Sequence, residues 1–221
     1  MLERQHLYFQ KRKIDLKGSM NREQEFIDYF LIVGLGNPGG EFVGTAHNVG
    51  RDFLIEHAKK NDEKFEHSGC KSYSILRTSF AGKPVIFLLP ETYMNRSGLA
   101  VLECIRYFKI NLRKVCVIHD DSDQIIGSLK LTKGQSSGGH KGIESIIASI
   151  GNKSFARLKV GVRPPSLASS EGKDHIKAER FVLKKIDSDS RERAFAKIEA
   201  AVSVWLEKGT DLAMNFVNRK E

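Results

Sequence analysis

The chain has 221 residues, 40% of them hydrophobic, and its 36 Lys and Arg against 27 Asp and Glu give a net charge of +9. No apolar run approaches the roughly 20 residues that a membrane span needs, which excludes an integral membrane protein and predicts no membrane partner. The length suits one globular domain. The positive charge favours a polyanionic partner such as nucleic acid but does not establish one.

The first 28 residues are polar and basic and contain no apolar segment of a secretory signal. We expect residues 1–28 to form a flexible leader and residues 29–221 to form the domain. The three cysteines fall at no metal-ligand spacing, and Cys104 and Cys116 stand among apolar neighbours as core residues do. This pattern favours a reducing cytoplasm.

Short apolar runs alternate with helical patterns along the chain. The first run, residues 30–35, stops at a glycine-rich loop, and apolar residues then recur at helical spacing over 49–60. Further strands are expected at 72–76, 84–89, 115–119, 128–132 and 158–162, with helices around 102–108 and 143–150. The alternation predicts an α/β fold, a single-domain mixed twisted sheet flanked by helices on both faces.

The C-terminal part of the chain predicts one loop and one helix. Residues 163–173 are rich in proline, glycine and serine and should form a loop, either an ordinary surface loop or a flap beside a site. Beyond it, Gly209 is the expected C-cap of a last helix. The apolar face of that helix consists of Phe195, Ile198, Val202, Trp205 and Leu206.

The glycine-rich loop fits the pattern G-x-G-x-x-G over residues 34–39. In a dinucleotide-binding fold, this pattern opens directly into a helix whose N-terminus holds a pyrophosphate. Here Pro38 and the polar stretch up to His47 delay the helix, and no second strand ends in an acidic residue at the required spacing. A nucleotide-dependent enzyme is therefore the weaker alternative, and we expect no cofactor.

His47 stands near the start of the first helix, at the carboxyl edge of the first strand, where open α/β folds build their sites. Imidazole can take a proton near neutral pH. His47 is therefore a candidate general base, although a lone histidine is more often structural.

Four segments stand out together: VGLGNPGGEFVGTAHNVG at 33–50, YMNRSG at 93–98, HDDSD at 119–123 and SGGHKGI at 137–143. In this order and at these separations, they resemble the signature segments of bacterial-type peptidyl-tRNA hydrolases, and the resemblance runs from Leu31 to the last helix. It implies an esterase that separates peptide from tRNA. The implied partner is peptidyl-tRNA, bound through its acceptor arm and peptide, and the implied enzyme is a cytoplasmic monomer without metal or cofactor.

The resemblance assigns roles to four polar residues. His47 would be the general base that activates water, and Asp120 would accept a hydrogen bond from its other ring nitrogen. Asn37 would contact the substrate near the ester, while Asn95 would bind substrate and help to orient the water or stabilise the oxyanion. Taken alone, each asparagine fits a turn, and Asp120, at the end of the strand expected at 115–119, fits a turn cap.

Two aromatic residues and two departures from the family pattern concern the tRNA. Phe42, where the family commonly has Tyr, and Tyr93 match positions at the tRNA end, where a ring can stack on a base or simply pack. Ala46 replaces the usual Arg before His47. Lys141 replaces an Asn at a substrate-binding position, where it could pair with a phosphate or remain in solvent.

A set of basic residues near these segments could form a phosphate-contacting surface. The set consists of Lys130, Lys133, Lys141, Arg157 and Lys159. Ala46 and Lys141 also leave open a catalytically inactive RNA-binding relative, similar to chloroplast intron-splicing factors. The presence of Asn37, His47, Asn95 and Asp120 favours the enzyme, because a binding module needs no water-activating pair. No serine nucleophile elbow and no zinc-binding motif is present.

Overall fold

A seven-stranded mixed sheet with the order β2-β3-β4-β1-β5-β7-β6 forms the centre of the fold. The computed structural model describes residues 27–67, 71–165 and 181–219, so most of the expected leader and of the loop expected at 163–173 lie outside it. The strands are β1 (Phe30–Gly34), β2 (Glu66–His67), β3 (Tyr73–Phe80), β4 (Lys83–Pro90), β5 (Val115–Ile125), β6 (Leu129–Lys133) and β7 (Ala156–Arg163). β4, β1, β5 and β7 run parallel, and the outer strands pair antiparallel.

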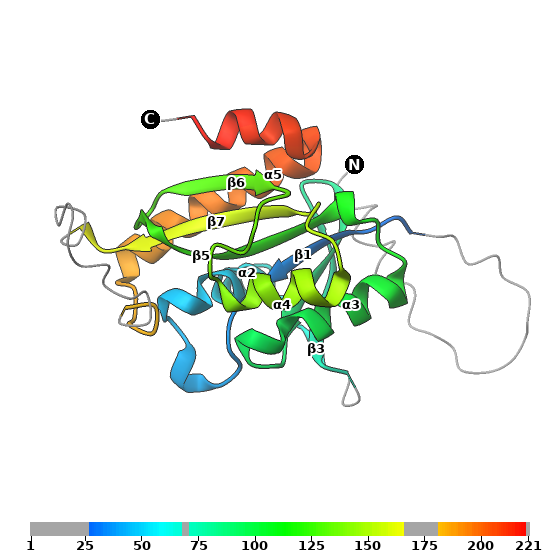
Figure 1. Ribbon diagram of the computed structural model, residues 1–221, viewed down its shortest axis with the longest axis horizontal. Helices are drawn as coiled ribbons and strands as arrows, with labels where there is room; N and C mark the ends of the chain where they lie inside the picture. The colour runs from blue at the N-terminus through cyan, green and yellow to red at the C-terminus, as the bar shows by residue number, and fades with distance from the viewer. Residues whose placement is uncertain (1–26, 68–70, 166–180, 220–221) are drawn as a thin grey trace, which may run out of the picture.

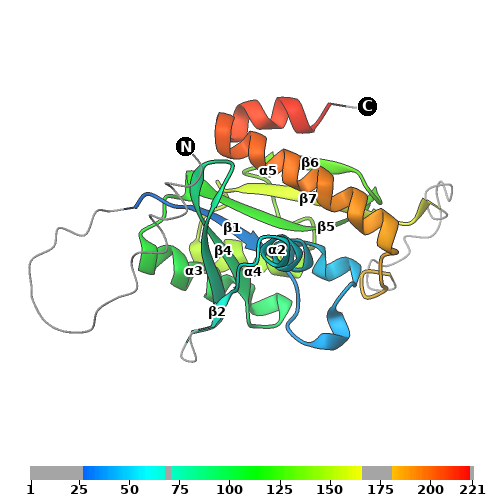
Figure 2. The same ribbon diagram turned by 180° about the vertical axis from the view of Figure 1, so that it is seen from behind.

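Helices cover both faces of the sheet, as predicted. α3 (Ser97–Phe108) and α4 (Lys141–Ile150) lie on one face, and α2 (Val49–Lys60) and α5 (Ser188–Val217) lie on the other (Figures 1 and 2). Successive residues of β1 point to opposite faces. Leu31 and Val33 therefore pack against α3 and α4, while Ile32 packs against α2 and α5. Each face has its own apolar core.

The expected elements are present, with four differences. Strand β3 continues to Phe80, beyond the strand expected at 72–76, because it pairs with β4 over its whole length. The two-residue strand β2 was not expected, and β5 runs on to Ile125 because β7 continues to pair with it beyond Asp120. Gly209 leaves the helical conformation with φ 74° and ψ 173°, which glycine adopts readily because it has no side chain. A further helical segment follows it, however, so Gly209 produces a kink within α5 and does not end it (Figure 2).

Close contact between α2 and the sheet fixes the start of this helix. A Cβ atom at Gly50 would lie 2.2 Å from the carbonyl oxygen of Ile118 in β5, and one at Gly34 would lie 2.5 Å from the carbonyl oxygen of Gly50. Only glycine permits this approach. The turn before α2, with His47, is therefore held over the carboxyl ends of β1 and β5.

The C-terminal end of α5 packs against the edge strand β6 (Figure 1). There the side chain of Asn218 accepts a hydrogen bond from the backbone N–H of Leu131 at 2.8 Å and donates one to its C=O at 2.9 Å. Within the described residues, no helix is both long enough and apolar enough to cross a membrane.

Candidate functional site

The carboxyl ends of three parallel strands bring the expected polar residues to one edge of the sheet. Asn37 follows β1, Asn95 follows β4, and Asp120 belongs to β5. Asp120 was expected just after the end of a strand, but it lies within β5, paired with Val160 of β7. The neighbouring β1 ends opposite Ile118, so Asp120 extends past β1 and faces the turn that carries His47.

His47 and His140 both hydrogen-bond to the same oxygen of Asp120. Nδ1 of His47 lies 2.8 Å and Nε2 of His140 lies 2.9 Å from Asp120 Oδ1. The Asp120 side chain is 3% exposed, whereas His47 is 16% exposed and therefore reaches the surface of the site. The structure thus brings together two predicted residues, His47 and Asp120, and adds a third.

The surrounding hydrogen bonds indicate how the protons are placed on both rings. His140 is the N-cap of α4, and its Nδ1 accepts from the backbone N–H groups of Gly142 and Ile143 at 3.1 and 3.3 Å. An accepting Nδ1 leaves the proton on Nε2, which donates to Asp120. In a neutral His47, the proton lies on Nδ1 toward Asp120, so the Nε2 lone pair remains to accept a proton.

Asp120 is held in its charged form. Burial disfavours the carboxylate, but the hydrogen bonds that Asp120 accepts from His140 and His47 outweigh burial and keep the pKa of Asp120 well below its usual value. The next ring, His119, is different. Burial lowers the pKa of His119 to about 3, and its Nδ1 donates to the backbone carbonyl of Asp120 at 2.7 Å. His119 is therefore a neutral packing residue and no base.

Asn37 is fixed by hydrogen bonds to Asn48, just before α2, and to Met94, in the loop after β4. Asn48 accepts from the backbone N–H of Asn37 and donates to its C=O, both at 2.9 Å. The side-chain oxygen of Asn37 accepts from the backbone N–H of Met94 at 2.8 Å. Asn37 was expected to contact the substrate near the ester, and its side-chain oxygen is already occupied by the Met94 N–H. Its Nδ2 remains as the donor.

The loop between β4 and α3 carries Tyr93 and Asn95 at the surface. Tyr93 is 63% exposed, and Asn95 is exposed in the short 3-10 turn η3 (Met94–Arg96). Met94 itself is buried, and its Sδ would lie only 2.5 Å from a Cβ atom at Gly142, the second residue of α4. The loops after β1 and β4 and the start of α4 therefore meet at Met94.

The other expected contact residues lie around these loops. Phe42 is half-buried in the 3-10 turn η1 (Gly40–Phe42), and Lys141 is exposed as the first residue of α4, directly after His140. The five expected basic residues do not form one free surface. Arg157 is only 2% exposed, and its guanidinium already donates to the carbonyl groups of Ser136 and Gln135. The prediction that Arg157 contacts phosphate is therefore wrong.

Two of the other basic residues have acidic partners. Lys133 pairs with Asp211 at 2.9 Å and Lys159 pairs with Asp121 at 2.6 Å. Lys130 is exposed in β6.

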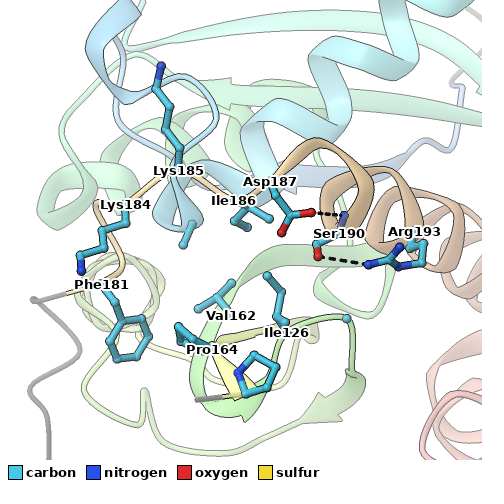
Figure 3. Close-up of a pocket in the computed structure, with 13 residues that line it drawn as sticks. Ile126, Val162, Pro164, Phe181, Lys184, Lys185, Ile186, Asp187, Ser190 and Arg193 are labelled. Carbon is cyan, nitrogen blue, oxygen red and sulfur yellow. Dashed lines mark hydrogen bonds between the residues drawn. The ribbon is translucent and has the colours of Figure 1, made fainter. Parts of the chain in front are cut away.

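Residues 181–187 hold the turn that contains His47. The backbone N–H of His47 donates to the carbonyl of Val182 at 2.8 Å, and that of Ala46 donates to Lys184 at 3.0 Å. Ala46 is buried in an apolar cluster with Val162, Phe181 and Val182. A cavity of about 580 Å³ is lined by Ala46, Val162 and Phe181 together with residues at the start of α5 (Figure 3). The residue before His47 thus acts through packing.

The first two glycines of the G-x-G-x-x-G pattern, Gly34 and Gly36, allow α2 to pack closely against the sheet. A Cβ atom at Gly36 would lie 2.6 Å from Cβ of Arg51 in α2, and Gly34 contacts Gly50 as described above. α2 begins only at Val49, after two short 3-10 turns, so no helix N-terminus opens at these glycines. This geometry argues against the dinucleotide alternative.

Among the residues that the structure describes, His47, Asp120 and His140 form the group with metal-ligand chemistry, their ligand atoms lying within 4.8 Å of one another. Nδ1 of His140 accepts two backbone hydrogen bonds, so its Nε2 carries a proton and has no lone pair for a metal. The three side chains therefore suit a hydrogen-bonded triad better than a metal site.

Sequence reasoning gave no role to His140 or Asn48, although both lie in the recognised segments. Each stands immediately before a helix, where His140 caps α4 and Asn48 precedes α2. Polar residues at such positions often bond to nearby backbone groups. That signal could have identified them, but not their partners.

Comparison with known proteins identifies similar sequences over most of the chain. The family model described as peptidyl-tRNA hydrolase matches residues 31–221. A peptidyl-tRNA hydrolase of Caldicellulosiruptor bescii is 35% identical over 86% of this chain and 96% of its own length. One of Thermodesulfovibrio yellowstonii is 38% identical over 86% of this chain and 98% of its own length. The crystal structure of peptidyl-tRNA hydrolase from Acinetobacter baumannii matches with a TM-score of 0.75 and 30% identity, over 89% of this chain and 97% of that one.

Proposed function

Because the chain belongs to the peptidyl-tRNA hydrolase family, we propose that it hydrolyses the ester bond between peptide and tRNA in peptidyl-tRNA. The products are free tRNA and a peptide, so the reaction returns tRNA to translation. The observation that carries this proposal is the contact of 2.8 Å between His47 Nδ1 and Asp120 Oδ1 at the carboxyl edge of the sheet. It leaves a basic nitrogen at an accessible position.

In the proposed reaction, His47 is the general base. Its Nε2 takes a proton from a water molecule as the water oxygen attacks the ester carbonyl. The charged Asp120 then stabilises the imidazolium and keeps the ring in the tautomer that exposes Nε2. When the tetrahedral intermediate collapses, the same proton passes to the ribose oxygen that leaves. His140 acts through Asp120 by holding the carboxylate from its other side.

Asn37 and Asn95 bind the reacting part of the substrate. The side-chain oxygen of Asn37 is occupied by Met94, so we assign its Nδ2 as a donor to the carbonyl oxygen, where negative charge develops. Asn95 projects from the exposed turn after Met94 and can reach the peptide backbone or the attacking water. Both amides donate without adding a charge that would have to be desolvated.

The tRNA contacts are proposed on chemistry and exposure. Tyr93 offers a free ring face to a base at the acceptor end, and the half-buried Phe42 offers a smaller contact. Lys141 and Lys130 are exposed and suit phosphate groups, in keeping with the net charge of +9. Since Lys141 adjoins His140, a phosphate bound to it would lie close to the catalytic triad.

We further propose that the enzyme works without a metal or cofactor, as a cytoplasmic monomer. The absence of a metal is supported by His140, whose Nε2 carries a proton and so cannot bind a metal ion. The monomer is supported by Asn218, which occupies backbone groups of the edge strand β6 that could otherwise pair with a second molecule. The cytoplasm follows from the substrate, which forms during translation. The comparisons lend no support to the alternative of an inactive RNA-binding relative, since the similar proteins are named hydrolases.

Hydrolysis of an N-blocked aminoacyl-tRNA by wild type and His47→Ala tests the proposal. We expect turnover by the wild type, a loss of at least about 10³-fold in His47→Ala, and little change in His57→Gln, which replaces a histidine on the α2 face that packs against Phe80. No turnover by folded wild type would refute the esterase, and tRNA binding without turnover would favour the RNA-binding alternative. Loss of activity with a chelator would refute the metal-free reaction.

A further inference from the structure

Arg51 joins the chain segment that carries His47 to the loop that carries Asn95. It lies in the first turn of α2, and its backbone N–H donates to the carbonyl of Leu35 at 3.0 Å. Its side chain lies along the backbone at Gly36, where a Cβ atom would come within 2.6 Å of Cβ of Arg51. Arg51 is thus fixed to the loop after β1 before its guanidinium makes any contact.

The guanidinium of Arg51 holds the end of β4 with three hydrogen bonds. Nη1 donates to the carbonyl of Pro90 at 2.7 Å, and Nη2 donates to both carboxylate oxygens of Glu91 at 3.1 and 3.0 Å. The two side chains are only 12% and 22% exposed. A planar guanidinium in this arrangement fixes both the distance and the orientation of its partner.

Glu91 is also held from the side of β3. Its backbone N–H donates to the carbonyl of Ser72 at 2.8 Å, and its Oε1 accepts from the hydroxyl of Ser74 at 2.7 Å. The next residues leave the sheet and form the loop with Tyr93 and Asn95. Glu91 is therefore the fixed point from which this loop starts.

We infer that Arg51 and Glu91 are a positioning pair that sets where Asn95 meets the substrate. The inference rests on the proposed function. The loop that carries Asn95 is anchored at two points. Arg51 binds its start at Pro90, and the side-chain oxygen of Asn37 accepts from the N–H of Met94 in its middle. Arg51 and Asn37 both belong to the chain segment that leads through His47 into α2. The pair thereby places the substrate-binding amide relative to the base.

A largely buried ion pair suits this role better than a role in stability. Desolvation of both charges offsets much of their attraction, so such pairs contribute little net stability but enforce one geometry. A shift of about 1 Å in a reacting group can lower the rate by about 10²-fold. We therefore expect Arg51→Met to lower kcat/KM about 10- to 100-fold. It should also lower the melting temperature, because the largely buried Glu91 carboxylate is left without its cationic partner.

The test measures kcat and KM for N-blocked aminoacyl-tRNA in Arg51→Met, Asn95→Ala and the double variant. Amide hydrogen exchange of residues 91–96 is followed in the same proteins. Glu91→Gln is the milder variant, because its amide oxygen still accepts from Ser74 while the charge is lost. Arg77→Met is the matched control, since Arg77 pairs with Glu66 at 3.1 Å on β3 and β2, with both side chains exposed and outside the Asn95 loop.

If the pair acts through the loop, Arg51→Met weakens activity strongly in the wild-type background but by less than about threefold when Asn95 is already Ala. The loop amides then exchange faster, while Arg77→Met matches wild type. Equal losses in both backgrounds, or unchanged activity and exchange in Arg51→Met and Glu91→Gln, would overturn the inference. The exchange measurement does not depend on turnover, so a wild type without activity would refute the proposed function and still leave the pair tested.

Discussion

The side-chain amide of Asn48 hydrogen-bonds to both backbone groups of Asn37, accepting from its N–H and donating to its C=O at 2.9 Å each. Asn48 is 1% exposed and follows His47 directly in the chain. One buried side chain therefore fixes the backbone of the proposed oxyanion donor relative to the proposed base. A carboxylate could not make both bonds, because it accepts hydrogen bonds but has no N–H to donate.

Asn48→Asp should lower both activity and stability. The carboxylate keeps the bond from the N–H of Asn37 but turns an acceptor toward its C=O in a buried place, which should cost about 2–4 kcal/mol of unfolding free energy and lower kcat/KM about 10²-fold. Denaturant unfolding and steady-state kinetics measure both effects. Asn111→Asp is the control, because the exposed Asn111 side chain only accepts, from Arg113 N–H. Wild-type kinetics in Asn48→Asp would contradict the positioning role.

Asp120→Asn should lower kcat by about 10²- to 10⁴-fold with little change in KM. The neutral amide cannot stabilise a charged imidazolium, and it can turn an N–H toward His47 in place of an acceptor. Pre-steady-state and steady-state hydrolysis of the blocked aminoacyl-tRNA separate the two constants. Asp121→Asn, at a carboxylate that accepts from Gln124 and pairs with Lys159, should keep most of the activity. A kcat within threefold of wild type in Asp120→Asn would remove Asp120 from the mechanism.

Asn37→Asp distinguishes the two roles of the Asn37 side chain, because it removes the Nδ2 donor and keeps an oxygen that accepts from Met94. A carboxylate oxygen can still accept from the Met94 N–H, so the loop should stay in place, but the Nδ2 donor is gone. We expect kcat to fall about 10²- to 10³-fold, the usual loss for one oxyanion donor, while amide exchange at residue 94 remains slow. If exchange there accelerates as much as in Asn37→Ala, the loss reflects loop movement and not the missing donor.

Asp52→Asn should raise the melting temperature near neutral pH. Burial raises the pKa of Asp52 above its usual value. The hydrogen bond from the Gly44 N–H and the charges of Arg191 and Arg51 lower this pKa, but burial outweighs them. A carboxyl whose pKa is higher in the folded state stabilises the fold below its unfolded pKa and loses that contribution as pH rises through the folded value. The neutral amide keeps an acceptor for the Gly44 N–H. Calorimetry should therefore show a gain at about pH 7 that disappears at about pH 3, below the ordinary pKa of aspartate; a gain independent of pH would contradict the electrostatic cause.

The hydrophobic pattern predicted most of the fold because each face of the sheet buries alternate residues. Residues 30–35 and 49–60 were placed almost to the residue, and Cys104 and Cys116 are buried core residues, where burial raises the pKa of both thiols to about 12. Strand β2 was not predicted, since its two exposed residues carry no apolar signal.

The extent of β5 was also missed, because it depends on pairing with β7 far along the chain. The candidate site was predictable only in part, for the same reason. The segments with His47 and Asp120 could be recognised from the sequence. That His47 and His140 both bond to Oδ1 of Asp120 could not, because it depends on where α4 begins. The Arg51–Glu91 pair joins residues from separate elements and has no local signature. Local patterns name the residues, whereas register and helix placement decide which of them meet.

Asn218 gives the end of the last helix a protective role. Both backbone groups of Leu131 that point away from the sheet are occupied by its amide, so an approaching strand from another molecule finds no free pair of groups there. A chain shortened before Asn218, or bearing a fusion that pulls the helix away, would uncover a template for intermolecular strand addition. Loss of a few C-terminal residues would then appear first as aggregation on storage, while the catalytic edge of each molecule stayed intact.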